Sequence, residues 1–513
     1  MGAEVIVRER TRAVIVGTMV LLAACTGGDS KEILRAARFE SADCPSEIRT
    51  VTLFHVSCGY LVVSQDRSRP GGPTARVFVS RWEPNAKTTA PIPVLYLGDD
   101  IGYSFDYVSV NGMVDHLVDR VVYAMEPRGA GQSQPNLSCP EVDALAVSTL
   151  TVPSDEAGAR SAFLDAVATC RDRIASQGID PADFSLEAAA ADAEDLRTAL
   201  GIDRWDLLTK GTSSRIAAEY LREFGAHAHA AFFSQVELPG MDPLALSVQG
   251  TQEALAALGS ACADDQRCER TFPTLEADVS ALVDRLQAHP MSVDVDGGSV
   301  LFDGAMLLRD IRTALSQIPD NQLGDGTRLP LVVEAAADDQ GRGLRPFAAS
   351  SRAAGTYCDG YLARCPVGLG FASGAYLSVL CRDIVPFIDT GELNGLTSGD
   401  VSWEEAFSDL PWMTACERWN VPSAATAVGS PISSDVPVFL TVGTFDPYDP
   451  RSAVVAAARG LSDLQISELP QGHRSFNSDC LSDVRRSFFV DPLAGSDESC
   501  SRSLHFRFSF ARR

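Results

Sequence analysis

The hydrophobic pattern of the chain predicts a sheet whose strands are separated by helices. Continuous apolar runs, each typical of a strand buried on both faces, occur at 92–97 and 121–125, and two further strand-like runs occur at 205–209 and 230–234. Alanine-rich segments that read as helices occur at 160–175, 186–200 and 214–222. Two strand-like segments joined by a turn, 51–58 and 75–82, precede them. Strands that alternate with helices are typical of the α/β class, with a mostly parallel sheet covered on both faces.

The pattern changes between residues 239 and 430. Strand-like runs become rare there and helical segments predominate, at 252–288, 305–317 and 331–338. Strand-like runs return at 436–442 and 464–469. We therefore predict a core in two parts, 45–238 and 431–500, interrupted by a helical cap, 239–430, and followed by a basic, aromatic tail, 501–513.

The first residues have the pattern of an export signal. Arg8, Arg10 and Arg12 precede an apolar run that ends in Leu22-Ala23-Ala24-Cys25. This ending resembles the lipobox of bacterial lipoproteins, which implies a signal peptide at 1–24, lipidation of Cys25 and a tether at 25–44. An ordinary secretory signal with a chance cysteine is the alternative. No later segment reaches the ~20 apolar residues of a membrane helix, so we expect a lipid anchor alone to hold the chain at the extracellular face of the cell membrane.

Chain length and net charge limit the classes of function that the protein can have. The 513 residues are about three times a typical domain length, which favours more than one lobe. With 45% hydrophobic and 22% charged residues the composition is that of a globular protein. The formal net charge of −25 speaks against nucleic acid as a ligand. We expect a monomer.

The cysteines predict disulfides rather than a metal centre. Removing Cys25 from the thirteen cysteines leaves an even number, which in an exported chain suggests six bridges. Pairing of sequence neighbours would give Cys44–Cys58, Cys139–Cys170, Cys262–Cys268, Cys358–Cys365, Cys381–Cys416 and Cys480–Cys500. A zinc site is the competing interpretation, but no Cys-x2-Cys or His-x3-His spacing occurs. We predict neither a metal nor a cofactor.

Two loops near the end of the chain carry candidate acid–base chemistry. Asp446 follows the strand-like run 436–442, and His473 follows the run 464–469. In α/β sheets, working residues sit on loops at the carboxyl ends of strands. A carboxylate on one such loop can orient an imidazole on the next, and the imidazole can then accept a proton from a hydroxyl.

Several further motifs support a family resemblance. They are the strand and glycine turn at 92–104, Pro127-Arg-Gly-Ala-Gly-Gln-Ser133, Cys170-Arg-Asp-Arg173, Asp195-Leu-Arg-Thr-Ala-Leu-Gly-Ile202, Ala415-Cys-Glu-Arg-Trp419, Gly443 to Pro450, and Gly472-His473. Over about residues 45–500 the chain resembles α/β-hydrolases of the secreted prolyl and tripeptidyl aminopeptidase type, in their actinobacterial lipoprotein form. The resemblance implies an α/β-hydrolase core with a cap, serine exopeptidase chemistry, and Asp446 and His473 as the catalytic acid and base.

The chain departs from this family at the nucleophile and at the oxyanion loop. The family carries Gly-x-Ser-x-Gly at the strand-to-helix elbow, whereas this chain has Thr209-Lys-Gly-Thr-Ser213, with Gly211 in the place of the serine. The family's oxyanion loop is His-Gly-Gly-Pro-Gly-Gly-Ser, whereas this chain has Gly98-Asp-Asp-Ile-Gly-Tyr-Ser104. Asp99 and Asp100 would oppose the negative charge that the loop must stabilise.

These departures predict a homologue that keeps the fold but is non-catalytic or severely impaired. It would bind a peptide-like or small ligand between cap and core. The alternative is an active peptidase or esterase with a displaced nucleophile, Ser213 or Thr212, serving His473. A third hypothesis places different chemistry on Lys210 or on the two loop carboxylates, although Lys210 also fits a solvated turn or a salt bridge to that loop.

The leader generates a first prediction. We expect the mature chain to begin at Cys25 and to carry a lipid on its thiol, because small residues precede the cysteine after a basic, apolar leader. Mass spectrometry of the mature N-terminus measures this. An unmodified terminus at another residue would contradict it.

Overall fold

The computed structural model describes residues 37–46, 48, 53–88, 90–98, 101–102, 117, 119–145, 157–296, 298–318, 326–336, 341–353, 371–397, 399–407, 410–473, 479–495, 499 and 501–510. The signal peptide and most of the tether lie outside these residues. So do several predicted site residues, namely Cys25, Asp99, Asp100, Cys358, Cys365 and Cys500.

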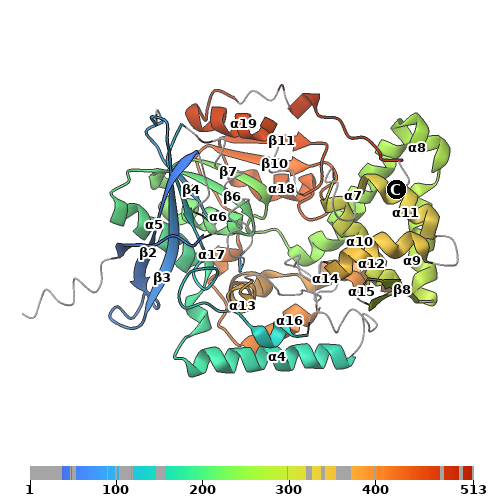
Figure 1. Cartoon of the computed structure of the whole chain (residues 1–513), viewed down its shortest axis with the longest axis horizontal. Coiled ribbons are helices and arrows are strands. Elements are labelled where there is room, and N and C mark those ends of the chain that lie inside the picture. Colours follow the sequence, from blue (N-terminus) through green and yellow to red (C-terminus); the bar gives the residue numbers. More distant parts are fainter. Residues whose placement is uncertain are drawn as a thin grey trace, which may run out of the picture.

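Within the described residues, nine strands form one large sheet (Figure 1). Their spatial order is β1 (Arg38–Ala42), β2 (Phe54–Ser64), β3 (Thr74–Pro84), β5 (Val122–Met125), β4 (Val94–Tyr96), β6 (Trp205–Gly211), β7 (Ala228–Val236), β10 (Val438–Gly443) and β11 (Leu464–Leu469). The pairs from β1 to β5 are antiparallel, and all pairs from β5 to β11 are parallel. This order, with β4 and β5 exchanged and an antiparallel edge, is that of an α/β-hydrolase core, as the sequence predicted.

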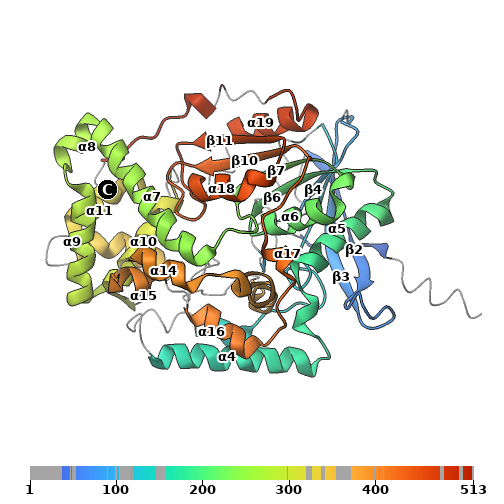
Figure 2. The ribbon, with the colours of Figure 1, turned by 180° about the vertical axis from the view of Figure 1, so that it is seen from behind.

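Helices cover both faces of the sheet. On one face lie α5 (Leu186–Leu200), α6 (Ser213–Phe224) and α18 (Arg451–Ala457), whose apolar side chains share one hydrophobic cluster with the strands (Figure 2). On the other face lies α19 (Asp479–Val490), where Phe488 contacts the ring of Phe439 at 5.5 Å between centroids. Burial on both faces explains why β10 is a largely apolar run.

Local sequence signals set the helix ends. Ser185 Oγ accepts a hydrogen bond from Ala188 N at the start of α5, and Gly201 ends that helix with a φ of 67°. Asp242 caps α7 (Pro243–Asp264) in the same way, and Pro243 occupies the first helical position, where its missing N–H costs nothing.

The segment between β7 and β10 is mostly helical and contains a second hydrophobic cluster. Its elements are α7, α8 (Gln266–Thr271), α9 (Leu275–Ala288), β8 (Met291–Val295), β9 (Gly298–Phe302), α10 (Gly304–Ser316), α11 (Leu329–Ala336), α12 (Arg345–Ala353), α13 (Ser373–Val379), a π-helical turn at Leu380–Ile384, α14 (Thr390–Thr397), α15 (Val401–Phe407), α16 (Leu410–Trp419) and α17 (Thr426–Gly429).

Two features of this segment differ from a purely helical cap. Strands β8 and β9 form an antiparallel hairpin, because Ser292-Val-Asp-Val295 alternates polar and apolar residues and a glycine-containing turn follows. In addition, α16 packs against α4 (Ala157–Ser176), α13 packs against α16, and both share the sheet's own cluster rather than the second one. The end of the segment thus extends the core.

The basic, aromatic tail packs against the second cluster. Phe506 contacts Phe445, beside the β10 loop, at 4.5 Å between ring centroids. Phe510 stacks on Phe272 at 6.4 Å, and Ser509 N donates to Thr327 O at 3.1 Å. The tail therefore connects the core loop to the helical segment.

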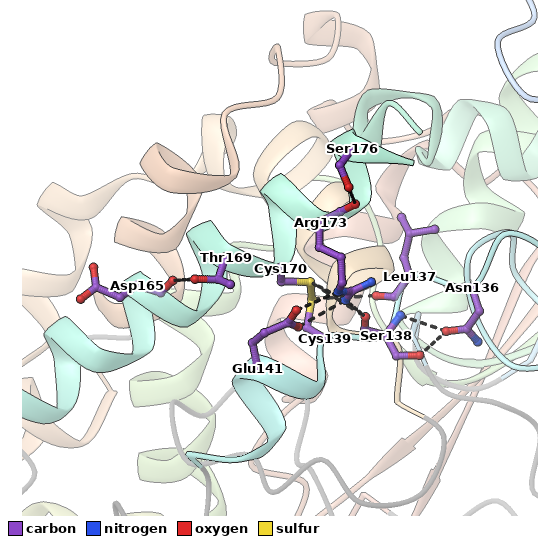
Figure 3. Close-up of polar contacts among 10 residues, drawn as sticks. All are labelled: Asn136, Leu137, Ser138, Cys139, Glu141, Asp165, Thr169, Cys170, Arg173 and Ser176. Atoms are coloured by element: carbon purple, nitrogen blue, oxygen red, sulfur yellow. Dashed lines mark hydrogen bonds and ion pairs between the residues drawn. A yellow bond between two sulfur atoms is a disulfide. The ribbon is translucent and has the colours of Figure 1, made fainter. Parts of the chain in front are cut away.

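Four predicted disulfides have both cysteines among the described residues, and all four are formed: Cys44–Cys58, Cys139–Cys170, Cys262–Cys268 and Cys381–Cys416. The predicted pairs Cys358–Cys365 and Cys480–Cys500 involve residues outside the described part of the chain. Figure 3 shows the bridge between α3 (Pro140–Asp143) and α4, where Arg173 also donates to Ser138 O at 2.7 Å. A Glu141–Arg173 ion pair at 2.7 Å supports the same contact.

These bridges generate a stability prediction. We expect Cys139→Ser with Cys170→Ser to lower the free energy of unfolding by about 3–4 kcal/mol, because the bridge closes a loop of 31 residues in the unfolded chain. The matched pair Cys262→Ser with Cys268→Ser, 6 residues apart, should cost about 2 kcal/mol. Urea unfolding followed by circular dichroism measures both. A larger loss for the shorter loop would contradict the loop-closure argument.

Candidate functional site

The turn from β6 to α6 has the backbone of a nucleophile elbow. Strand β6 ends at Gly211, where its register with β7 shifts, and α6 begins at Ser213. Gly211 has a φ of 65°, in the left-handed region that favours glycine. In α/β-hydrolases the nucleophile occupies such a strained strand-to-helix turn. The elbow is therefore present, and the residue at its apex has no side chain.

The elbow hydroxyls bind neighbouring backbone. Ser213 is fully buried, and its Oγ lies 2.6 Å from Gly98 O and 2.9 Å from Lys210 O. Its single hydrogen is thus directed at carbonyl oxygens. Thr212 Oγ1 accepts a hydrogen bond from Ile101 N at 2.6 Å. These contacts tie the elbow to the loop after β4, of which Asp99 and Asp100 lie outside the described residues.

The loop after β10 is folded around Asp446. This side chain is only 4% exposed, and its Oδ1 accepts hydrogen bonds from Tyr448 N at 2.9 Å and Asp449 N at 3.2 Å. An aspartate that accepts from the backbone two and three residues ahead stabilises its own turn. The carboxylate is therefore held in one orientation before any ligand arrives.

His473, on the loop after β11, faces this carboxylate. Its Nδ1 lies 3.0 Å from Asp446 Oδ2, and also 3.2 Å from Asp449 Oδ2. The loop reaches this position because Gly472 passes against the end of α10, where a Cβ would meet Leu315 O at 2.1 Å. Strands β6, β10 and β11 run parallel, so Gly211, Asp446 and His473 lie at the same edge of the sheet.

The second carboxylate changes the electrostatics of the histidine. Burial disfavours the charged imidazole, but the charges of Asp446 and Asp449 outweigh burial and raise the pKa of His473 well above its ordinary value. A raised pKa favours the protonated imidazole, whereas a general base must be neutral. Asp449 was not among the residues predicted from the sequence, although the repeated Asp-Pro of Asp446-Pro-Tyr-Asp-Pro450 was the available signal.

Asp446, Asp449 and His473 are also the described residues that could hold a metal ion. Their ligand atoms lie within 4.8 Å of one another. Metal binding requires a deprotonated imidazole, and here the Nδ1 atom faces the two carboxylates directly. The arrangement therefore favours a proton on His473, and we assign no metal to it.

The part of the chain that carries Asp446, Asp449 and His473 matches one protein-family model. Residues 403–500, from α15 to the segment after α19, match a family model described as TAP-like protein. No curated protein matches the chain. In the described part of the chain, no helix is both long and apolar enough to cross a bilayer.

Three solved structures that match the chain at low identity illustrate the likeness. A proline iminopeptidase from Mycobacterium smegmatis is 12% identical with a TM-score of 0.36, covering 82% of this chain and 97% of its own. A proline iminopeptidase-related protein from Thermus thermophilus is 14% identical with a TM-score of 0.34, covering 85% and 96%. An esterase from Thermogutta terrifontis is 11% identical with a TM-score of 0.35, covering 83% and 96%. The α/β-hydrolase assignment rests on the strand order.

The paired carboxylates generate a pH prediction. A folded-state pKa above the unfolded one stabilises the protein below about pH 6.5, and this contribution is lost as the pH rises through the folded pKa. We expect Asp449→Asn to lower the pKa of His473 toward its ordinary value and to shrink this alkaline loss. NMR titration of the His473 ring and urea unfolding between pH 6 and 10 measure both effects. The exposed control Asp294→Asn should change neither, and an unchanged pKa in Asp449→Asn would contradict the contact.

Proposed function

We propose that this protein is a non-catalytic, or severely impaired, homologue of α/β-hydrolase exopeptidases that binds a peptide-like or small ligand between the sheet and the helical segment. The observation that carries the proposal is Gly211, which stands at the apex of an elbow with a φ of 65° and supplies no nucleophile. The match of residues 403–500 to a TAP-like family supports a peptidase-like ancestry.

Two further observations support the loss of catalysis. Loss of a triad nucleophile can cost roughly 10⁶ in turnover, and the neighbouring Ser213 directs its hydroxyl at carbonyl oxygens. In addition, Asp446 and Asp449 favour a protonated His473, which cannot accept a proton from a hydroxyl. Each departure removes a different group that the nucleophilic attack requires, so restoring one of them leaves the other defect in place.

The alternative is a peptidase or esterase that uses Ser213 or Thr212. The observation that favours it is the retained contact between His473 and Asp446 at 3.0 Å. We rank it second because a nucleophilic Ser213 would have to give up its present contacts and turn toward His473.

We also propose that the protein is a lipoprotein on the extracellular face of the cell membrane, held there by Cys25 alone. The leader that ends in Leu22-Ala23-Ala24-Cys25 supports the anchor. The disulfides support export, because such bridges persist in oxidising compartments. Within this proposal the protein acts as a monomer and binds neither nucleic acid nor a cofactor.

The proposal generates an activity prediction. We expect negligible hydrolysis of aminoacyl p-nitroanilides and p-nitrophenyl esters by the native protein and by Gly211→Ser, because the loop carboxylates and the protonated His473 remain. Turnover should appear only when Asp99→Gly and Asp100→Gly, and Asp449→Asn to lower the pKa of His473, are added to Gly211→Ser, with glycines at 209 and 213 if the elbow needs more room.

The controls use the same assays. Adding His473→Ala to the most active variant should abolish its turnover, and a fluorophosphonate probe should not label the native protein. Robust turnover by the native protein that His473→Ala removes would overturn the proposal. Labelling at Ser213 or Thr212 would then identify the displaced nucleophile.

A further inference from the structure

The boundary between the core and the helical segment is tightly closed. Two cavities lie along it, one beside Phe407 and Trp412 and the other beside Asp449, and Arg312 of α10 lines both. Their volumes are about 20 Å³ and 10 Å³, which leaves room for no more than about one water molecule in each. A ligand, which the proposed function places at this boundary, cannot enter these cavities as they stand. Binding there therefore requires the helical segment to move away from the edge of the sheet.

The C-terminal tail crosses this boundary as a separate connection (Figure 1). A short helical turn near its start, Ser501–Ser503, lies against β11 of the core. Residues 504–510, which we call the strap, run from there to α8 of the helical segment (Figure 2). Three aromatic side chains at every second position of the strap pack against the second hydrophobic cluster, namely Phe506, Phe508 and Phe510.

One end of the strap contacts the loop that carries Asp446. The ring of Phe506 lies 4.5 Å from the ring of Phe445 between centroids. Phe445 is 2% exposed and directly precedes Asp446, and its N–H donates to Gln471 O in the β11 loop at 2.9 Å. Phe445 is also a member of the second cluster. The strap therefore packs at the point where the two site loops meet the helical segment.

The other end of the strap is fixed to the helical segment. Phe510 stacks on Phe272 at 6.4 Å between ring centroids, and the guanidinium of Arg267 lies 4.3 Å from the centroid of Phe510. Both partners lie in α8 or directly after it, and the Cys262–Cys268 bridge attaches α8 to α7. This end of the strap thus rests on a covalently supported part of the helical segment.

The strap is held mainly by its rings. Among the described residues, 505–510 make one backbone hydrogen bond to the rest of the chain, from Ser509 N to Thr327 O at 3.1 Å. The three phenylalanines are only partly buried. A segment with few buried contacts and few backbone hydrogen bonds opens at a lower free energy than the fold around it. The strap can therefore detach while the core and the helical segment remain folded.

The site loops also contact the helical segment through hydrogen bonds. Gly472 N donates to Ile318 O at 2.7 Å, and Ser452 Oγ donates to Glu253 Oε1 of α7 at 2.9 Å. These bonds and the strap act in parallel, because each connects the same two parts of the molecule. Release of the strap leaves fewer contacts to break when the helical segment moves, so the strap raises the free energy of opening.

We propose that residues 504–510 form a releasable strap that controls how often the boundary between the core and the helical segment opens to admit a ligand. While the strap is in place the boundary is closed. Release of either Phe506 or Phe510 allows the helical segment to move away from the β10 loop. This inference rests on the proposed function, because opening matters only if a ligand binds at this boundary. It involves no covalent step.

Thiol labelling of the full mature chain measures the opening. Leu244→Cys introduces a thiol at the boundary, where Leu244 is 3% exposed, and Leu207→Cys introduces one in β6, where Leu207 is fully buried. Labelling by a maleimide, corrected for the chain without either substitution, reports opening of the boundary in the first case and unfolding of the core in the second. We expect Phe506→Ala to accelerate the first labelling about tenfold and to leave the second almost unchanged, because the lost ring contacts hold only the strap.

Matched variants test whether the tail acts as a strap. Phe510→Ala should accelerate labelling of Leu244→Cys as much as Phe506→Ala does, and the two together should add little, because release of either end releases the strap. Full additivity would contradict this. Phe506→Leu, which keeps an apolar side chain, should have a smaller effect. Phe224→Ala is the control and should change neither rate, since Phe224 is also partly buried, with a ring contact to Tyr220 at 5.5 Å, but lies on α6.

The outcomes separate this inference from the proposed function. Unchanged labelling of Leu244→Cys in both Phe506→Ala and Phe510→Ala would overturn the strap. Equal acceleration of the Leu207→Cys thiol, or loss of folding, would assign the tail to the stability of the whole fold and overturn it as well. Neither result concerns the missing nucleophile at Gly211, so the proposed function would still be decided by the hydrolysis assays. Conversely, hydrolysis by the native protein would refute the proposed function, while selective opening in Phe506→Ala would still support the strap.

Discussion

The buried carboxylate of Asp446 sets the requirements of the site. A charge that is only 4% exposed has to be compensated, and three groups do so: two backbone N–H groups of its own loop and the imidazole of His473. This compensation joins the loops after β10 and β11, which also share a backbone hydrogen bond from Phe445 N to Gln471 O at 2.9 Å. With Asp449 as a second carboxylate, the stable arrangement is an imidazolium. The interaction that orders the site thus opposes general-base catalysis by His473.

The elbow illustrates that the fold does not depend on the nucleophile. The conformation at Gly211 follows from the geometry of a strand that turns directly into a helix, and glycine adopts it without the strain that a serine would store there. Ser213 then contributes a hydrogen bond to Gly98 O, where the family places a second small glycine. Glycine at position 211 relieves backbone strain, and serine at position 213 adds a hydrogen bond. Loss of catalysis is therefore compatible with a more stable elbow, in line with the common conflict between active-site strain and stability.

The sequence predicted the site best where the hydrophobic pattern of the strands and the parallel order of the sheet place residues at the same edge. Parallel strands place the loops that follow them at one edge of the sheet, and this was sufficient to bring Asp446 and His473 together. The roles of Asp449 and Arg312 were not predictable in this way. Asp449 faces the imidazole only because the turn after Asp446 closes on itself, and an Asp-Pro pair is more often a simple turn. Arg312 has the spacing of an ordinary helix residue, and its burial depends on α10 packing against a loop more than a hundred positions later in the chain.

Tyr448 connects the two parts of the site. Its ring contacts the guanidinium of Arg312 at 3.9 Å and the ring of His473 at 4.8 Å. Asp446 and Asp449 carry two negative charges, which together balance the guanidinium and a protonated imidazole. Loss of the proton from His473 would leave this buried group of side chains with a net negative charge, so the charge balance favours the imidazolium. The electrostatics of the site thus oppose the use of His473 as a general base, in addition to the missing nucleophile at Gly211.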